Sequence, residues 1–299
     1  MSRKFKGIIY ASLGAILFGA SSIIATILFR NKSISPEWLV TMRMLGSGVL
    51  LLGYLIIRKK DVFTPWKNLK SVVILVSLGI FGVLFAQGSF MLSIYYGNAA
   101  VATILQSFGP TVIIIYLAIS SRKFPSKIEI LAVLLSIVGI FLMVTNGNIN
   151  AVKVSILSII FGIISAFGVC AYSLIPRGIL TQQNSLIIVG WGLLIGGGVS
   201  SIFNPIIKVP KAFDLKDLYL LVIIIVFGTL LAYSLYVNSL IYIEPHVASM
   251  LGILEPTVTL LVSIAVFKTS FLSFQVVGIV IIFISLLIIN YPSKIQIKQ

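Results

Sequence analysis

Glu255 is the acidic residue that lies deepest inside an apolar run, within the stretch ILEPTV from Ile253 to Val258. The six other Asp and Glu residues fall between apolar runs or near their ends. A carboxylate at membrane depth costs desolvation free energy, and such groups usually face a bundle interior or a wet cavity. Because burial favours the neutral form of a carboxyl group, Glu255 is a candidate proton carrier or amine partner. The open alternative is a neutral hydrogen-bonded contact between two helices.

Five further polar residues inside apolar runs are candidates for substrate binding together with Glu255. Gln87 and Gln106 lie in the first half of the chain, and Tyr172, Tyr233 and Tyr236 lie in the second. Tyr233 and Tyr236 are three residues apart, a spacing that places them on one helix face. Since apolar helices often carry one polar group as interhelical glue, each of these residues alone also fits a structural role.

Pro110 and Pro256 each interrupt an apolar run near its middle. A proline cannot donate to the carbonyl four residues earlier, so the pattern predicts free carbonyls at Gln106 and Gly252. At membrane depth a free carbonyl must bind another helix, water or a ligand. We therefore expect a kink or hinge at both prolines, which either lines a cavity or is satisfied by neighbouring helices.

Arg43 and His246 are two other charged or titratable residues within the predicted spans. Arg43 lies in an early turn of an apolar run, and we expect its side chain to snorkel to the head groups, with binding of an anionic substrate group as the alternative. His246 lies near the end of a run and is expected at the interface, out of phase with Glu255. With one His and one Cys, no metal, cofactor or internal disulfide is expected.

The composition predicts an all-α polytopic membrane protein. Of 299 residues, 59% are hydrophobic and 10% charged, and the mean hydropathy is +1.15, whereas soluble domains average about 25% charged residues. Apolar runs of bilayer length recur throughout the chain. Breaks at charges, Pro and Asn predict ten transmembrane helices, at 7–29, 36–57, 69–93, 98–119, 128–145, 153–175, 185–207, 217–241, 245–267 and 273–290.

The net charge of +15 is a topology signal, because the basic residues lie almost wholly between apolar runs. No nucleic-acid partner is therefore expected. With the N-terminus inside, fourteen Lys and Arg fall on the cytoplasmic side and seven on the other. The positive-inside rule then places both termini in the cytoplasm.

The chain contains an internal repeat. At a shift of 146 residues, residues 69–112 align with residues 215–258 without a gap, and 16 of the 44 positions are identical. The last identities are the PTV stretches that contain Pro110 and Pro256. At a shift of 147, small residues four apart also coincide, which is a spacing that lets helices approach closely in lipid; they are Ala11, Ala15 and Gly19 against Ser158, Gly162 and Ala166.

Each repeat holds five predicted spans, so the second copy must enter the membrane from the opposite side. This predicts two inverted five-helix repeats, at residues 1–149 and 150–299. Inverted repeats are common in secondary transporters, whose sites lie near the midplane between the halves.

Four stretches resemble the EamA-type, ten-helix branch of the drug/metabolite transporter superfamily. They are PEWLVTMRMLGSGVLLL from Pro36, AAVATILQSFGPTVIIIYLAI from Ala99, SAFGVCAYSLIPR from Ser165 and VASMLGILEPTVTLLVSIAVF from Val247. The resemblance covers the whole chain and includes the positions of Arg43, Pro110 and Glu255-Pro256. It implies a plasma-membrane carrier that exports amino acids or other small metabolites by alternating access. Members of the family typically end helices 4 and 9 with a glutamate, whereas this chain has Ser121 and Phe267.

The sequence favours a secondary transporter of a small molecule, with proton coupling left open and with a monomer or homodimer as the oligomeric state. A channel or facilitative uniporter is the alternative, although the sequence shows neither rings of charge nor a carbonyl filter. An intramembrane enzyme is less favoured, because no Asp lies deep inside a span and motifs such as HExxH or Ser with His and Asp are absent.

Overall fold

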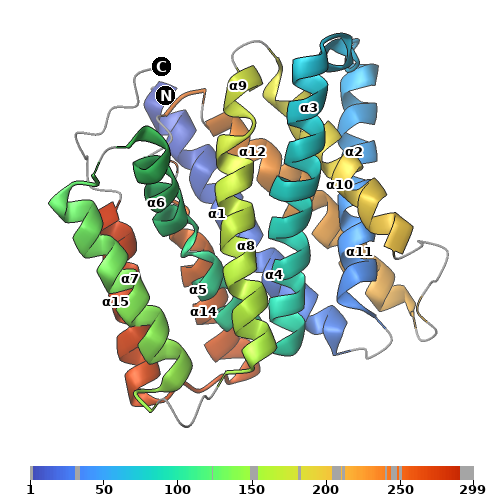
Figure 1. Cartoon of the computed structure of the whole chain (residues 1–299). Helices are drawn as coiled ribbons and strands as arrows, with labels where there is room; N and C mark the ends of the chain where they lie inside the picture. Colours follow the sequence, from blue (N-terminus) through green and yellow to red (C-terminus); the bar gives the residue numbers. More distant parts are fainter. Residues whose placement is uncertain are drawn as a thin grey trace.

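The computed structural model describes residues 3–30, 34–122, 124–148, 154–180, 183–203, 210, 213–239, 241–243, 248 and 251–289. Every regular element in this part of the chain is helical, as the composition predicted. Figure 1 shows the helices as one bundle. Their bounds are α1 (Arg3–Phe29), α2 (Pro36–Ile57), η1 (Thr64–Lys67), α3 (Leu69–Ser77), η2 (Leu78–Leu84), α4 (Phe85–Tyr96), α5 (Ala99–Gln106), α6 (Gly109–Ser121), α7 (Lys127–Thr145), α8 (Ile156–Leu174), α9 (Arg177–Leu180), α10 (Ser185–Phe203), α11 (Leu215–Ile225), η3 (Val226–Leu231), α12 (Ala232–Ser239), α14 (Leu254–Phe267) and α15 (Ser273–Ile289).

Eight helical stretches of the described chain are long and apolar enough to cross a bilayer, and they confirm a polytopic membrane protein. They are residues 3–29, 36–57, 69–96, 99–121, 127–145, 156–179, 185–203 and 215–239. Two shorter apolar helices follow, Leu254–Phe267 and Ser273–Ile288. Because residues 244–247, 249 and 250 lie outside the description, the count of ten spans stays a prediction.

Side chains that occupy the N-cap position begin several helices. Ser35 accepts from the backbone N–H of Trp38 and precedes Pro36, while Asn98 accepts from that of Val101. Ser126 and Glu129 form a reciprocal capping box at α7. These contacts satisfy N–H groups that a helix start leaves without a partner, so each span begins at a defined residue.

The bundle has a pair of helices at each edge and a broken-helix centre (Figure 1). Helices α7 and α15 pack together at one edge, and α2 packs on α10 at the other. Between them, α1 packs on α12 and α14, while α8 packs on α4, α5 and α6. Since α1 and α8 occupy equivalent positions in the repeat, the two halves make corresponding contacts around them.

The small-residue seams lie in the interior of the bundle. Ala11 and Ala15 on α1 are 0% and 2% exposed, and Ser158 and Ala166 on α8 are both 0% exposed. Large apolar side chains such as Leu134 instead point outward from α7. This distribution is the one expected of a helical bundle in lipid, where small residues line helix contacts.

Three backbone features recur at equivalent positions of the two halves. The third span of each half contains a π-helical segment, η2 in the first and η3 in the second. The next span is interrupted in both, at Ser107–Phe108 and at Gly252–Ile253. Helices α6 and α14 then end at the left-handed residues Arg122 (φ 52°) and Lys268 (φ 53°), which are 146 positions apart.

The prolines stand in the first turn of the helix that follows each two-residue interruption, at the places where the sequence predicted a kink or hinge. Pro110 is the second residue of α6 and Pro256 is the third of α14. An N–H in the first turn of a helix has no intrahelical partner, so proline costs little there. The carbonyl of Gly252, expected to be free, accepts the backbone N–H of Glu255 at 3.1 Å.

Candidate functional site

The centre of the bundle brings together Gln87, Tyr172, Tyr233 and Tyr236 near Glu255, five of the six binding residues expected from the sequence. The Gln87 amide donates to the Tyr233 hydroxyl at 2.6 Å. The rings of Tyr172 and Tyr233 are in edge contact, with centroids 6.2 Å apart. Glu255 interacts electrostatically with all three tyrosines. The group therefore draws on α4 from the first half and on α8, α12 and α14 from the second.

Gln87 and Tyr233 occupy the same position in the two repeats, since they are 146 residues apart. Both side chains are buried, with exposed fractions of 7%. Phe18 of α1 packs edge-on against the Tyr233 ring, with centroids 4.8 Å apart. The hydrogen bond therefore joins the two halves of the chain at the centre of the site.

Glu255 is the second residue of α14, directly after the break in the span. The side chain keeps partial exposure, as do those of Tyr172 and Tyr236. Within the described chain no hydrogen bond or ion pair holds the carboxylate, whose charged neighbour is Arg43. Partial exposure without a fixed partner leaves the carboxylate available to water or to a ligand, and fits the first interpretation of Glu255 better than a satisfied contact between helices.

Packing explains why the first half lacks this carboxylate. Gly109 occupies the equivalent position, and a Cβ atom there would lie 2.8 Å from the Val169 side chain of α8, closer than ordinary packing permits. The residue of α1 that corresponds to Val169 is the smaller Ser22, which binds Thr259 one turn beyond Glu255. The second half thus has room for a side chain where the first half has none.

Arg43 is buried in the bundle, so the expected snorkelling to the head groups is wrong. The side chain is 2% exposed. Its Nε donates to Thr229 Oγ1 at 3.0 Å, and one terminal nitrogen donates to Ser21 Oγ at 3.1 Å and to the Gly228 carbonyl at 3.3 Å. These oxygens point inward from α1 and η3, and they satisfy a guanidinium that burial would otherwise make costly. The sequence does hold a signal for this burial: Ser47 lies four residues after Arg43, so a second polar side chain lies on the same face of α2.

The remaining candidate residues add no side-chain hydrogen bond to this group within the described chain. Gln106 is the last residue of α5, and within the described residues no hydrogen bond joins its side chain to the central group. Pro110 and Pro256 set the starts of α6 and α14 and offer no polar side chain. His246 lies outside the described residues.

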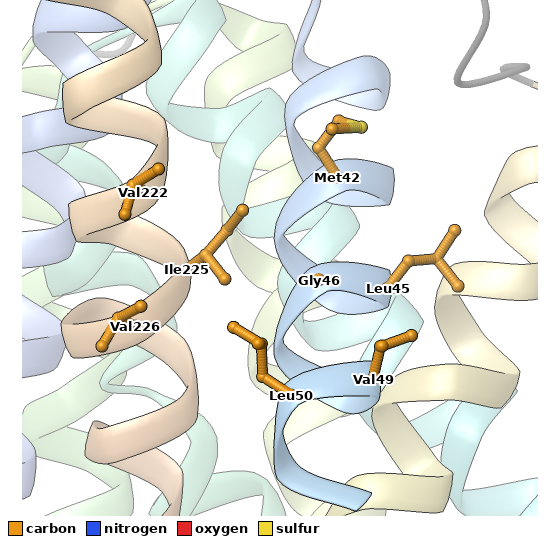
Figure 2. A pocket seen from close by; sticks show the side chains of 8 residues that line it. All are labelled: Met42, Leu45, Gly46, Val49, Leu50, Val222, Ile225 and Val226. Carbon is orange, nitrogen blue, oxygen red and sulfur yellow. The ribbon is translucent and has the colours of Figure 1, made fainter. Parts of the chain in front are cut away.

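A groove between α2 and α11–η3 has a volume of about 390 Å³ and, unlike the central group around Glu255, an apolar lining (Figure 2). Val49 and Leu50 on α2 are 60% and 49% exposed, and Val222 on α11 is 48% exposed. The lining is wholly apolar; it consists of Met42, Leu45, Gly46, Val49, Leu50, Val222, Ile225 and Val226. Such a surface suits hydrocarbon contact and offers no group that could orient a polar ligand.

The charged side chains outside the spans include one exposed ion pair. Lys67 and Asp61 form an exposed ion pair at 2.7 Å in the loop after α2. Hydrogen bonds from Lys67 and from the backbone N–H of Phe63 lower the pKa of Asp61. Across the described ranges, no three His, Cys, Asp or Glu residues gather in a metal-binding group.

Three comparisons relate the chain to known proteins. The model of the EamA-like transporter family matches the chain twice, at residues 5–145 and 156–291. The chain is 30% identical over 298 residues to a protein of Salmonella typhimurium named the uncharacterized inner membrane transporter YicL, with 98% of each covered. A crystal structure matches 93% of this chain and 94% of its own with a TM-score of 0.63; its 12% identity makes this a likeness of fold alone.

Proposed function

Because the chain belongs to the EamA-like transporter family, we propose that it is a secondary active transporter that exports small metabolites such as amino acids by alternating access. The observation that carries this proposal is the meeting of the two halves at a carboxylate that keeps partial exposure, Glu255, beside Tyr172, Tyr233 and Tyr236. Tyrosine rings offer apolar contact area and hydroxyl groups, and a carboxylate offers a site for an amine or a proton.

The position of the site supports alternating access. Gln87 and Tyr233 join equivalent helices of the two halves, and Glu255 lies at a break in a span. Transporters built from inverted repeats bind substrate between the halves, at discontinuous helices, and rock one half against the other. We therefore propose that residues 1–149 and 150–299 are two inverted five-helix units that move about this centre.

Proton coupling is the part of the proposal that depends on Glu255. Its charged and titratable neighbours are Arg43 on α2, Tyr172 on α8 and both tyrosines of α12. A carboxylate beside an arginine that has its own neutral hydrogen-bond partners can exchange a proton without leaving that arginine unsatisfied. Substrate and proton would then compete for one side chain, which is a simple route to coupled exchange.

We place the protein in the plasma membrane with both termini in the cytoplasm, on the distribution of Lys and Arg. Cysteine labelling in intact cells tests this topology and the inversion together. A cysteine in the loop 122–126 should react only from inside, and one in the loop 268–272 only from outside. Reaction of both from the same side would contradict the inverted repeat.

The experiment that tests transport uses purified protein in proteoliposomes, loaded in turn with radiolabelled amino acids, nucleosides and sugars. We expect saturable efflux of one class that depends on an imposed pH gradient. Empty liposomes and liposomes with heat-denatured protein are the controls. Saturable flux that no gradient can concentrate would favour the facilitative uniporter, and unsaturable conductance in a planar bilayer would favour a channel.

A further inference from the structure

Arg43 connects four helical elements of the bundle. From α2 it reaches Thr229 and Gly228 in η3 and Ser21 on α1. Its other terminal nitrogen lies 3.6 Å from the sulfur of Met91 on α4. All of these partners are neutral, so the guanidinium acts here as a set of fixed donors, a geometry that suits arginine better than lysine.

Side-chain donors reach η3 and the two α11 residues that precede it. A π-helical turn replaces the usual i→i−4 backbone hydrogen bonds by i→i−5 bonds, and each of its carbonyls has a second lone pair that can accept from a side chain. Three such side-chain bonds are present. Thr229 donates to the Ile224 carbonyl at 3.0 Å, Ser47 to the Ile225 carbonyl at 2.9 Å and Arg43 to the Gly228 carbonyl.

Among the described residues, no side chain donates to the carbonyls of the matching segment η2, whose π-helical form is accompanied by apolar packing instead. Val83 of η2 corresponds to Thr229, and it faces Gly192 of α10, where a Cβ atom would lie 3.5 Å from the Val83 side chain. Gly192 thus occupies on α10 the place that Arg43 occupies on α2. A second pair of contacts supports this correspondence. Gly46 of α2 packs on Ile225, and in the other half Ile195 of α10 packs on Gly79, so the glycine and the isoleucine have exchanged sides.

The register of α12 depends on whether η3 keeps its π-helical turn. Tyr233 follows the end of η3 by two residues, and its hydroxyl group accepts from Gln87. Conversion of the π turn to a regular α turn would rotate all later residues by about 100°. We propose that Arg43 is a positioning residue that holds η3 in its π-helical form, so that α12 presents Tyr233 to Gln87. The inference rests on the proposed function only in treating Tyr233 as part of a transport site.

Cysteine labelling along α12 tests the register directly and needs no substrate. In a Cys170→Ala background, single cysteines at positions 235–239 are reacted with a membrane-permeant maleimide. Ser239 is fully buried and positions 235–238 are partly exposed, so position 239 should be the protected one. In Arg43→Gln we expect the protected position to move by one residue, from 239 to 238.

Two further variants keep the test decisive. Thr229→Val removes both the acceptor for Arg43 Nε and the donor to the Ile224 carbonyl, so it should shift the pattern in the same direction even if Arg43→Gln is poorly produced. Thr41→Val is the matched control, since Thr41 lies on α2 and its hydroxyl bonds in the described chain join it to the Glu37 carbonyl and to Ser200 of α10. An unchanged pattern in Thr229→Val or in well-folded Arg43→Gln would overturn the inference, as would an equal shift in Thr41→Val.

Discussion

The two interrupted spans, which contain Pro110 and Pro256, have a similar backbone conformation and differ in charge. Each is interrupted within one residue of the same repeat position, starts a new helix with a proline in its first turn and ends that helix at a left-handed basic residue. Yet the second carries Glu255 where the first carries Gly109. The difference follows from one neighbour, since Val169 leaves no room at Gly109.

The same contrast holds for Arg43, the charged neighbour of Glu255. Arg43 lies on α2, and Gly192 takes its place on α10. Breaks, π turns and caps occur in both halves, whereas Glu255 and Arg43 each occur in one. The repeated sequence therefore provides the backbone framework, and the positions at which the halves differ, Glu255 and Arg43, provide the charged groups. These positions are the ones to mutate.

The largest effect is expected from giving the first half the missing carboxylate. Gly109→Glu forces a side chain against Val169, and overpacking alone costs about 1–3 kcal/mol, to which the buried charge adds. We expect little or no monodisperse protein in size-exclusion chromatography. The double variant Gly109→Glu, Val169→Ser should recover yield, because it copies the Ser22 side of the second half. Normal yield of the single variant would contradict the packing argument.

Removing the carboxylate from the second half should change transport and leave the fold intact. In Glu255→Gln we expect the dependence of proteoliposome flux on pH to flatten, with an unchanged elution profile and thermal midpoint. Asp61→Asn is the control, because that carboxylate lies in an exposed loop, and its profile should match the parent. A parental pH response in Glu255→Gln would reduce Glu255 to a packing residue.

Breaking the contact between the halves should have an intermediate effect. Tyr233→Phe removes the hydroxyl that accepts from Gln87 and leaves a buried amide N–H without this acceptor, a loss of about 1–3 kcal/mol. Thermal unfolding in detergent should show the loss, and substrate KM should rise. Tyr236→Phe is the matched control on the same helix, with a smaller expected change. Equal midpoints for the two variants would remove the special role of the Gln87–Tyr233 pair.

The smallest effect is expected at the helix starts, where the halves differ only in detail. Asn68 caps α3 by accepting from Lys70, and Asp214 caps α11 in a reciprocal box with Asp217. Replacing either cap by alanine should cost about 1 kcal/mol, with the larger loss at Asp214, since its capping oxygen belongs to a carboxylate, which also interacts favourably with the N-terminal end of the helix dipole. Thermal midpoints of the two variants measure the difference, and a larger loss at Asn68 would reverse the ranking.

Much of the fold could be predicted from the sequence, because apolar run length and breaks are direct consequences of the bilayer. The repeat also pointed to Glu255 and to the tyrosines of α12, since a polar residue in an apolar span faces the interior. The burial of Arg43 could not be predicted, because it depends on oxygens that η3 and α1 bring to it across the bundle. A break at proline and a kink at proline look alike in sequence, and a π-helical turn has no residue pattern of its own.

The bond between Gln87 and Tyr233 has a consequence for how the two halves can diverge. In a dimer of identical chains, a contact between equivalent positions must be made by two copies of one residue type, so donor and acceptor cannot be assigned separately. A single chain holding both copies is free of that constraint. An amide can occupy one position and a phenol the other, and the meeting point of two similar units thereby becomes asymmetric, with the donor fixed in one half and the acceptor in the other.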